Sequence, residues 1–180
     1  GVTITGTFTA GFNSSFGSNA AAAQAAWNSA ANTFSSFLTD NIHINITVDA
    51  VAGTGVFGQS STSLVSTSYA NMRTLLLADS KTADDATALG VGGSVTSADP
   101  IGTAHSWWVS RAEAKAIGLI ADDFSNDGTT TFGAGNPFTF SGSIAGGTYD
   151  FQGVAAHEIS EVMGRIPGLS QIGLHADAAL

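Results

Sequence analysis

Residues 149–164 read YDFQGVAAHEISEVMG, and this stretch predicts a buried helix over residues 151–163. Asp150 suits the N-cap position, because its side-chain oxygen can accept hydrogen bonds from free amides of the first turn. Gly164 stands where a glycine commonly ends a helix. Most of the surface of this helix is apolar, which is typical of a helix covered by other elements. Its apolar residues include Val154, Ala155, Ala156, Ile159, Val162 and Met163.

The N-terminal part predicts a strand, a helix and a second strand. Residues 2–9 alternate apolar or β-branched residues with Gly and Thr, which favours a strand. Apolar residues at helical spacing predict a helix over residues 20–38. Strict alternation over residues 42–51 predicts a half-buried strand with one polar face. The Gly-rich and Ser-rich segments 11–17 and 53–63 are expected to be a link and a loop.

The middle of the chain predicts short elements of both kinds. Ser110 and Glu113 have the S-x-x-E spacing of a capping box, so a helix is expected to begin there and to stop near Gly118. Helical character is expected at 64–78 and 84–89, and strands at 107–109, 129–132 and 138–140. This order predicts an α+β (α/β-like) fold with a mixed twisted sheet, as a single domain over residues 1–180.

Composition excludes several classes of partner. The 180 residues contain 5 Lys and Arg against 14 Asp and Glu, a net charge of −9. Nucleic acids and anionic membrane surfaces both require a basic footprint, so neither is an expected partner. No apolar run approaches the length of a membrane span.

Small residues and the lack of cysteine favour a secreted bacterial protein. Ala, Gly, Ser and Thr together make up about half of the chain, and cysteine is absent. The absence of cysteine restricts any metal site to histidine and carboxylate ligands. We therefore expect secretion, and a metal site, if present, built from nitrogen and oxygen donors.

Three chemically active residues cluster on the predicted helix. His157 and Glu161 are four residues apart and so project from one face, with Glu158 beside them. In the H-E-x-x-H arrangement the two histidines bind zinc and the glutamate is the general base. Glu161 replaces the second histidine, and a carboxylate is an acceptable zinc ligand. Buried His and Glu side chains also need partners, which favours a metal over chance.

The same stretch resembles the active-site helix of metzincin-type zinc metallopeptidases. Residues 127–132 and 110–119 resemble the strand and the helix that precede it in secreted bacterial members. The resemblance implies a sheet with a backing helix and an active-site helix, and a peptide substrate that pairs with an edge strand above a cleft. It implies that His157 and Glu161 bind Zn²⁺ and that Glu158 activates the water that attacks the peptide carbonyl.

The sequence departs from the metzincin pattern at the third ligand. The expected position is Pro167, which cannot bind a metal, and no Met-turn follows. His175 is the first candidate for this ligand and Asp177 the second. Alternatively, the natural protein continues past Leu180 and this chain lacks a C-terminal subdomain. A surface histidine in a frayed terminus is an equally good interpretation of His175.

A second group of oxygen donors precedes Gly128. Asp122, Asp123, Asn126 and Asp127 could offer ligands to Ca²⁺, but their spacing differs from the EF-hand loop. An Asx-turn exposed to solvent is the favoured interpretation.

Two functions follow from the motif and its departures. The first is a secreted zinc metallopeptidase that acts on peptides or proteins. The second is a non-catalytic secreted binding or surface domain on a degenerate peptidase scaffold. An ion pair between Glu161 and Arg165, one helical turn apart, would favour the second.

Overall fold

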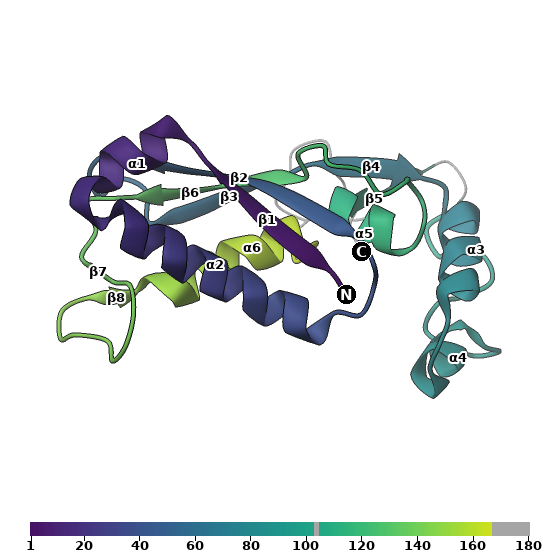
Figure 1. Cartoon of the computed structure of the whole chain (residues 1–180). Coiled ribbons are helices and arrows are strands. Elements are labelled where there is room, and N and C mark those ends of the chain that lie inside the picture. Colours follow the sequence, from purple (N-terminus) through teal and green to yellow (C-terminus); the bar gives the residue numbers. More distant parts are fainter. Residues whose placement is uncertain (103–104, 167–180) are drawn as a thin grey trace. The chain divides into compact units, whose positions relative to one another are not determined.

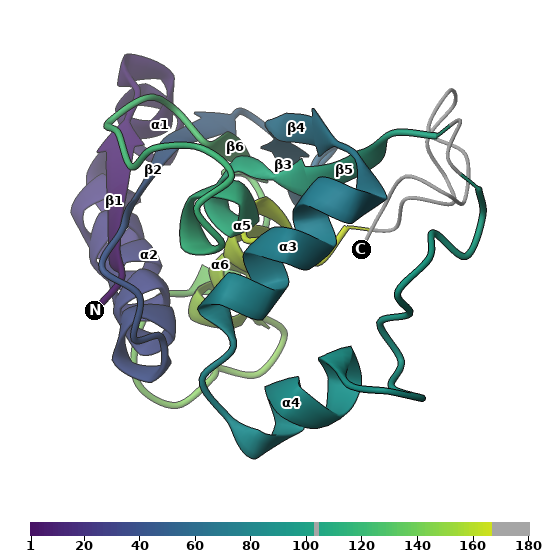
Figure 2. The same ribbon diagram turned by 90° about the vertical axis from the view of Figure 1, so that its right-hand side faces the viewer.

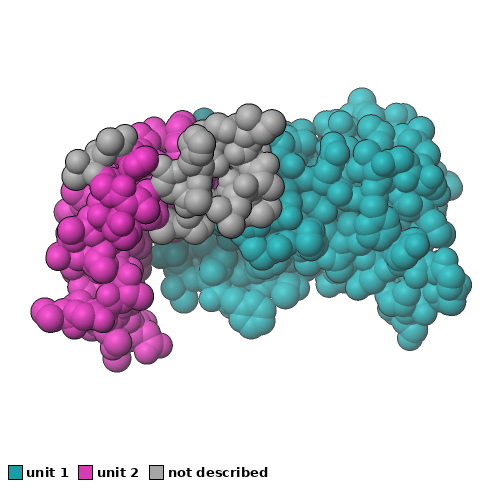
Figure 3. Space-filling view, turned by 180° about the vertical axis from the view of Figure 1, so that it is seen from behind, with its two compact units in different colours: residues 1–63, 122–165 teal, residues 64–121, 166–180 magenta. Residues whose placement is uncertain are grey.

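The computed structural model describes residues 1–102 and 105–166. The chain divides into two compact units, which Figure 3 colours separately. The first unit contains residues 1–63 and 122–165, and the second contains 64–121 and Ile166 of the described chain. The single domain over 1–180 stays a prediction, and each unit is described by itself.

A mixed four-stranded sheet forms the centre of the first unit. Its order is β1 (Thr3–Phe8), β2 (His43–Val51), β6 (Gly128–Gly133), β3 (Gly58–Thr62). The first three strands are parallel, and β3 runs antiparallel to β6 at one edge. The α+β class and the mixed sheet are therefore confirmed.

The strand β2 follows its sequence pattern closely. Ile44, Ile46 and Val48 are buried, while the residues between them are only partly covered. Period-two burial of this kind is what alternating apolar residues predict.

The edge strand β3 lies inside a segment that was expected to be a loop, so that prediction was wrong. Its sequence, GQSST, has few residues that favour strands. Pairing with β6 creates the strand, with Gly58 opposite Phe132 and Thr62 opposite Gly128. Residues distant in sequence therefore override a weak local preference.

Three α-helices and one short 3₁₀ helix accompany this sheet in residues 1–63 and 122–165. The prediction of a link over 11–17 was wrong, because α1 (Ala10–Phe16) forms there with the Thr9 side chain as its cap. The short helix η1 (Gly17–Asn19) leads into α2 (Ala20–Phe37), which confirms the expected long helix. The motif helix is α6 (Phe151–Val162), also as predicted. Helices α2 and α6 pack against each other along the sheet (Figure 1).

Aromatic rings fill the space where α6 begins. The ring of Phe151 is fully buried and contacts four other phenylalanine rings at centroid distances of 4.8–5.5 Å. These rings are Phe16, Phe132, Phe138 and Phe140. Two of them come from or follow β7 (Phe138–Thr139), which pairs with β8 (Tyr149–Asp150). The cluster ties the first turn of α6 to both the sheet and α1.

The described residues of the second unit form a strand pair and three helices. Strand β4 (Leu64–Thr67) pairs antiparallel with β5 (Trp107–Ser110). Residues 64–67 were expected to be helical, so the prediction for 64–78 holds only from α3 (Tyr69–Asp79) onward. Helix α4 (Ala83–Leu89) contacts α3 (Figure 2). Five side chains form the buried core of this unit: Tyr69, Met72, Trp107, Val109 and Ala114.

The capping box at Ser110 is present as predicted. The Ser110 hydroxyl accepts from the Glu113 amide at 3.0 Å, and a Glu113 carboxylate oxygen accepts from the Ser110 amide at 3.0 Å. This box opens α5 (Arg111–Ala116), and Gly118 follows it with φ of 76°. Burial raises the pKa of Glu113, and the bonds from Ser110 oppose that effect.

Replacing Trp27 by Phe should destabilise the first unit by about 2–4 kcal/mol. The indole Nε1 donates to Thr130 Oγ1 at 3.1 Å, and both residues are fully buried. The smaller ring leaves a void and a hydroxyl without its partner. Asn28→Ala, at the next and exposed position of α2, is the control and should change stability by less than about 0.5 kcal/mol. Urea unfolding of both variants tests this, and equal midpoints would contradict it.

Replacing Glu113 by Gln should stabilise the protein more at pH 7 than at pH 4. A raised pKa in the folded state means that folding favours the protonated carboxyl, so stability is lost as pH rises from the unfolded value of 4.5. Glutamine keeps an acceptor for the Ser110 amide without a charge to desolvate. The difference in Tm between variant and wild type at the two pH values measures the effect. A larger gain at pH 4 would contradict the assignment.

Candidate active site

His157 and Glu161 lie side by side on α6, as their spacing predicts. Their Nε2 and Oε1 atoms are 3.3 Å apart. Two ligands at about 2.0–2.1 Å from one tetrahedral zinc stand roughly 3.3–3.4 Å apart, so this pair fits two positions of such a site. The His157 side chain is 57 % exposed and that of Glu161 is 24 % exposed, so an ion has access to both.

The buried face of α6 sets the direction of these side chains. Asp150 stands at the N-cap position as predicted, although its side chain makes no capping hydrogen bond. Helix α6 ends at Val162, and Gly164 adopts a φ of 126° two residues later. The buried side of α6 carries Phe151, Ala155, Glu158, Ile159 and Val162. Because these residues face inward, His157 is turned toward solvent.

The edge strand β3 holds Glu161 in place. Ser60 Oγ donates to Glu161 Oε2 at 2.5 Å, and Thr62 Oγ1 donates to the Glu161 carbonyl at 3.0 Å. Sequence reasoning missed both residues. No local pattern marks them, since Ser60 and Thr62 become neighbours of α6 only when β3 pairs with β6.

Arg165 provides a positive charge one turn beyond Glu161. Its Nη2 lies 3.8 Å from Glu161 Oε1 and donates to the His157 carbonyl at 3.3 Å. Its Nε donates to Ser160 Oγ at 2.8 Å. Glu161 therefore faces two potential cations, His157 and Arg165, on the same helix.

Glu158 differs from its neighbours because it is buried, with 5 % of its surface exposed. This burial raises the pKa of Glu158, and the carboxylate of Glu161 raises it further. The charges of His157 and Arg165 act in the opposite direction. A glutamate with a raised pKa holds its proton more readily than an ordinary surface glutamate does, so it is better suited to take up a proton and pass it on.

A cleft of about 540 Å³ opens beside His157 and Glu158. Its apolar wall includes Phe57, Tyr149 and Val154, and the first two rings meet edge to face at 4.8 Å. The volume lies within the range of sites that hold small molecules or side chains. The start of β3 borders the cleft at Gly58, where an added Cβ would stand 2.8 Å from Glu158 Oε1 and from Val154 Cγ1.

Both candidates for a third metal ligand lie outside the described residues. His175 and Asp177 both belong to the segment after 166, so their position is not described. Within residues 1–102 and 105–166, no group of three histidine, aspartate or glutamate side chains is arranged to bind a metal. Among the described donors, the pair His157 and Glu161 on α6 has the spacing of two zinc ligands.

The acidic segment before Gly128 is anchored to β2. Asp122 pairs with His43 Nδ1 at 2.7 Å, Asn126 accepts from the Thr47 amide, and Asp127 accepts from the Asn45 amide. Asp123 accepts from the Ser125 amide two residues on, which is the geometry of an Asx-turn. These hydrogen bonds and this ion pair explain the conformation of the segment without a bound ion. The Ca²⁺ site stays a prediction that the geometry does not support.

Comparisons with known proteins identify no relative. No protein-family model matches the sequence, and searches of curated proteins and of solved structures found no match. Among the described helices, none combines the length and apolar character needed to cross a membrane.

Replacing Gly58 by Ala should destabilise the fold by about 1–3 kcal/mol. The new methyl group would collide with Val154 and would push the Glu158 carboxylate away from β3. Gly55→Ala is the matched control, because a Cβ there meets nothing within 4 Å. Thermal or urea unfolding compares the two variants. Indistinguishable stabilities would show that the approach of β3 to α6 is looser than described.

Proposed function

We propose that this protein is a secreted, zinc-dependent metallopeptidase of metzincin-like type. The observation that supports this most is the 3.3 Å separation of His157 Nε2 and Glu161 Oε1 on a helix that also carries a buried glutamate. The two donors have the spacing of ligands to one zinc, and Glu158 borders the same cleft. The charge-poor, cysteine-free composition supports secretion.

Zinc, when bound, would supply Lewis acidity that polarises the peptide carbonyl. His157 and Glu161 would hold the ion, and Ser60 would keep the Glu161 carboxylate oriented through its 2.5 Å hydrogen bond. His175 remains the first candidate for a third ligand.

Glu158 would act as the proton carrier. Its carboxylate would take one proton from the attacking water and pass it to the nitrogen of the leaving amine, so that a peptide and water yield an acid and an amine. The raised pKa of Glu158 suits both halves of this transfer.

The substrate would be an extended peptide. Strand β3 pairs with β6 on one side and is the last strand of its sheet, so its other side can accept a peptide backbone. Phe57, Tyr149 and Val154 would then receive an apolar substrate side chain near Glu158.

One observation favours the alternative function, a non-catalytic binding or surface domain. Glu161 makes the ion pair with Arg165 that the sequence suggested as a sign of a degenerate site, at 3.8 Å. This contact is long and exposed, and such pairs are individually weak. An ion held by His157 would compete with it for the same carboxylate oxygen.

Purified wild-type protein should contain close to one zinc per chain and should cleave an unstructured protein such as casein. His157→Ala should lose the zinc, since an alanine offers no donor, while His43→Ala serves as the matched histidine control and should keep it. Elemental analysis after gel filtration measures both. Zinc far below one per chain in the wild type, after incubation with the metal, would contradict the metallopeptidase.

Glu158→Gln should keep zinc but lower the rate of cleavage by roughly 10²–10⁴-fold, because the amide cannot take the proton. Glu113→Gln, in the second unit, is the control and should retain full activity. Full activity in Glu158→Gln would show that the base is another residue. Zinc binding without cleavage by the wild type would favour the non-catalytic domain.

A further inference from the structure

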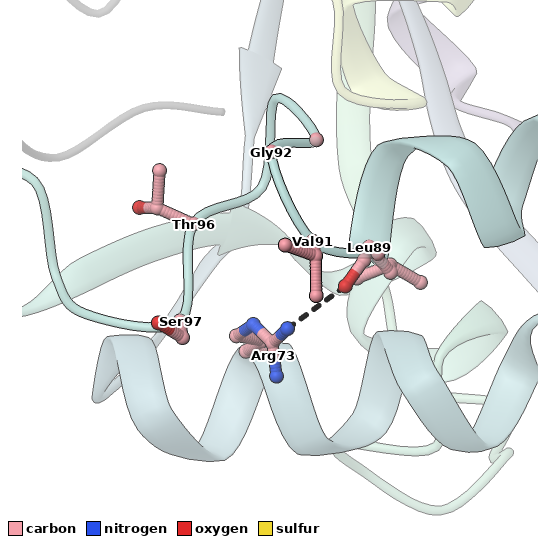
Figure 4. A pocket seen from close by; sticks show the side chains of 8 residues that line it. Arg73, Leu89, Val91, Gly92, Thr96 and Ser97 are labelled. Carbon is pink, nitrogen blue, oxygen red and sulfur yellow. Dashed lines mark hydrogen bonds between the residues drawn. The ribbon is translucent and has the colours of Figure 1, made fainter.

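The second unit contains a pocket of about 400 Å³ (Figure 4). The residues that line it are distant in sequence from the motif helix α6. Arg73 lines it from α3, and the facing wall is the chain from Leu89 to Ser97. All of these residues belong to the same compact unit. The pocket is mainly apolar apart from the arginine and two hydroxyl side chains, Thr96 and Ser97.

The guanidinium of Arg73 has donor capacity that the described protein leaves unused. Its Nη2 donates to the Leu89 carbonyl at 2.9 Å, at the C-terminal end of α4. Its Nε is buried and has no hydrogen-bond acceptor among residues 1–102 and 105–166. A guanidinium has five N–H donors, so the bond to Leu89 accounts for only one of them. Buried donors without acceptors are rare and call for an explanation.

Arg73 also lacks a counter-charge in the described part of the chain. No carboxylate from residues 1–102 or 105–166 pairs with it, although the protein has 14 acidic residues and only 5 basic ones. By contrast, Lys81 pairs with Asp79 at 2.8 Å and Arg165 approaches Glu161. Since no carboxylate of the described residues neutralises Arg73, its guanidinium can bind an anion.

The loop that faces Arg73 is held firmly against α4. The Gly93 amide donates to the Gly90 carbonyl at 3.0 Å, and the Val95 amide donates to the Ala88 carbonyl at 2.9 Å. A Cβ on Gly93 would stand 2.2 Å from the Ala88 carbonyl oxygen, so only glycine permits this approach. The wall of the pocket is therefore already formed without a ligand, which lowers the entropic cost of binding.

We propose that this pocket binds a small monocarboxylate that carries an apolar substituent. The planar fork of an arginine matches a carboxylate, and the Ser97 hydroxyl, which makes no hydrogen bond to the described residues, is a further donor. Leu89 and Val91 offer apolar surface for the substituent. A single cation in an acidic chain favours one negative charge over the higher charge of phosphate.

Two sources share this chemistry: a free carboxylic acid and the C-terminal carboxylate of a peptide. Both would place the carboxylate at Arg73 and the apolar group along Leu89 and Val91. The proposal is independent of the zinc site, since no residue of the pocket belongs to it.

The test is a titration of the full chain with N-acetyl-leucine, followed by calorimetry or by chemical shifts of the backbone amides of 89–97. We expect saturable binding, about tenfold or more weaker binding of N-acetyl-leucinamide, which lacks the charge, and weaker binding of inorganic phosphate. Equal binding of the amide, stronger binding of phosphate, or no binding of the carboxylate would overturn the proposal.

Val91 supplies a matched pair of variants. Its side chain is fully exposed, so substitution there spares the core, and it lines the pocket with Arg73 (Figure 4). Val91→Asp and Val91→Asn both remove the apolar side chain, but only Val91→Asp adds a charge. Val91→Asp should therefore bind N-acetyl-leucine at least about tenfold more weakly than Val91→Asn does, through charge repulsion and pairing with Arg73. Equal affinities of the two variants would overturn the placement of the carboxylate. Arg73→Gln should also abolish binding, but it removes the bond to Leu89 as well, so the Val91 pair decides.

The tripeptide Gly-Gly-Leu with an acetylated N-terminus distinguishes the two sources. Binding tighter than that of N-acetyl-leucine supports a peptide C-terminus, because the added backbone makes further contacts. Weaker binding of the tripeptide supports a free acid. Failure of the tripeptide and N-acetyl-leucine alike overturns the site.

Discussion

The close approach of α6 and α2 to the sheet is the constraint on which the first unit depends, and glycine makes it possible. A Cβ on Gly128 would stand 2.7 Å from Val162 Cγ1, and one on Gly6 would stand 2.6 Å from the Trp27 ring. At Gly58 the same addition would collide with Val154. Glycine at these three positions thus has a structural cause, because a helix side chain packs this closely against the sheet only where the strand lacks a Cβ. The direction of His157 and Glu161 follows from this packing.

Residue 161 is a glutamate, where the H-E-x-x-H arrangement has a histidine, so this position carries a negative charge. Polar and cationic groups lie around that charge. Ser60 donates to one carboxylate oxygen, while His157 and Arg165 lie near the other. A neutral imidazole at this position would not need such partners. The same carboxylate raises the pKa of the neighbouring Glu158, so the substitution bears on both the candidate metal ligand and the candidate base. A zinc bound here would carry an additional negative ligand, which weakens its Lewis acidity relative to a site with neutral ligands.

In the second unit, Arg73 contrasts with the acidic composition of the chain. With 5 basic residues against 14 acidic ones, each cation has an ample supply of partners, yet Arg73 is placed among a helix end, glycines and hydroxyls. Its hydrogen bond to Leu89 lies at the end of α4, and its buried Nε has no acceptor in the part of the chain that the structure describes. Burial of a polar group in this way costs free energy that an acceptor would recover. The pocket is thus distinct in chemistry from the cleft beside α6, which combines carboxylates with an apolar wall.

Elements with strong local periodicity were predictable from the sequence. Alternation in β2, helical spacing in α2, the capping box at Ser110 and the apolar surface of α6 each arise from neighbours in the chain, and each was confirmed. The juxtaposition of His157 and Glu161 also follows from helix geometry alone. Tertiary structure decided the rest. Strand β3 forms because its backbone pairs with that of β6. Helix α1 forms because Phe12 and Phe16 become buried when it packs beside the sheet. Ser60, the burial of Glu158 and the isolation of Arg73 depend on contacts between distant segments, and no local pattern encodes such contacts.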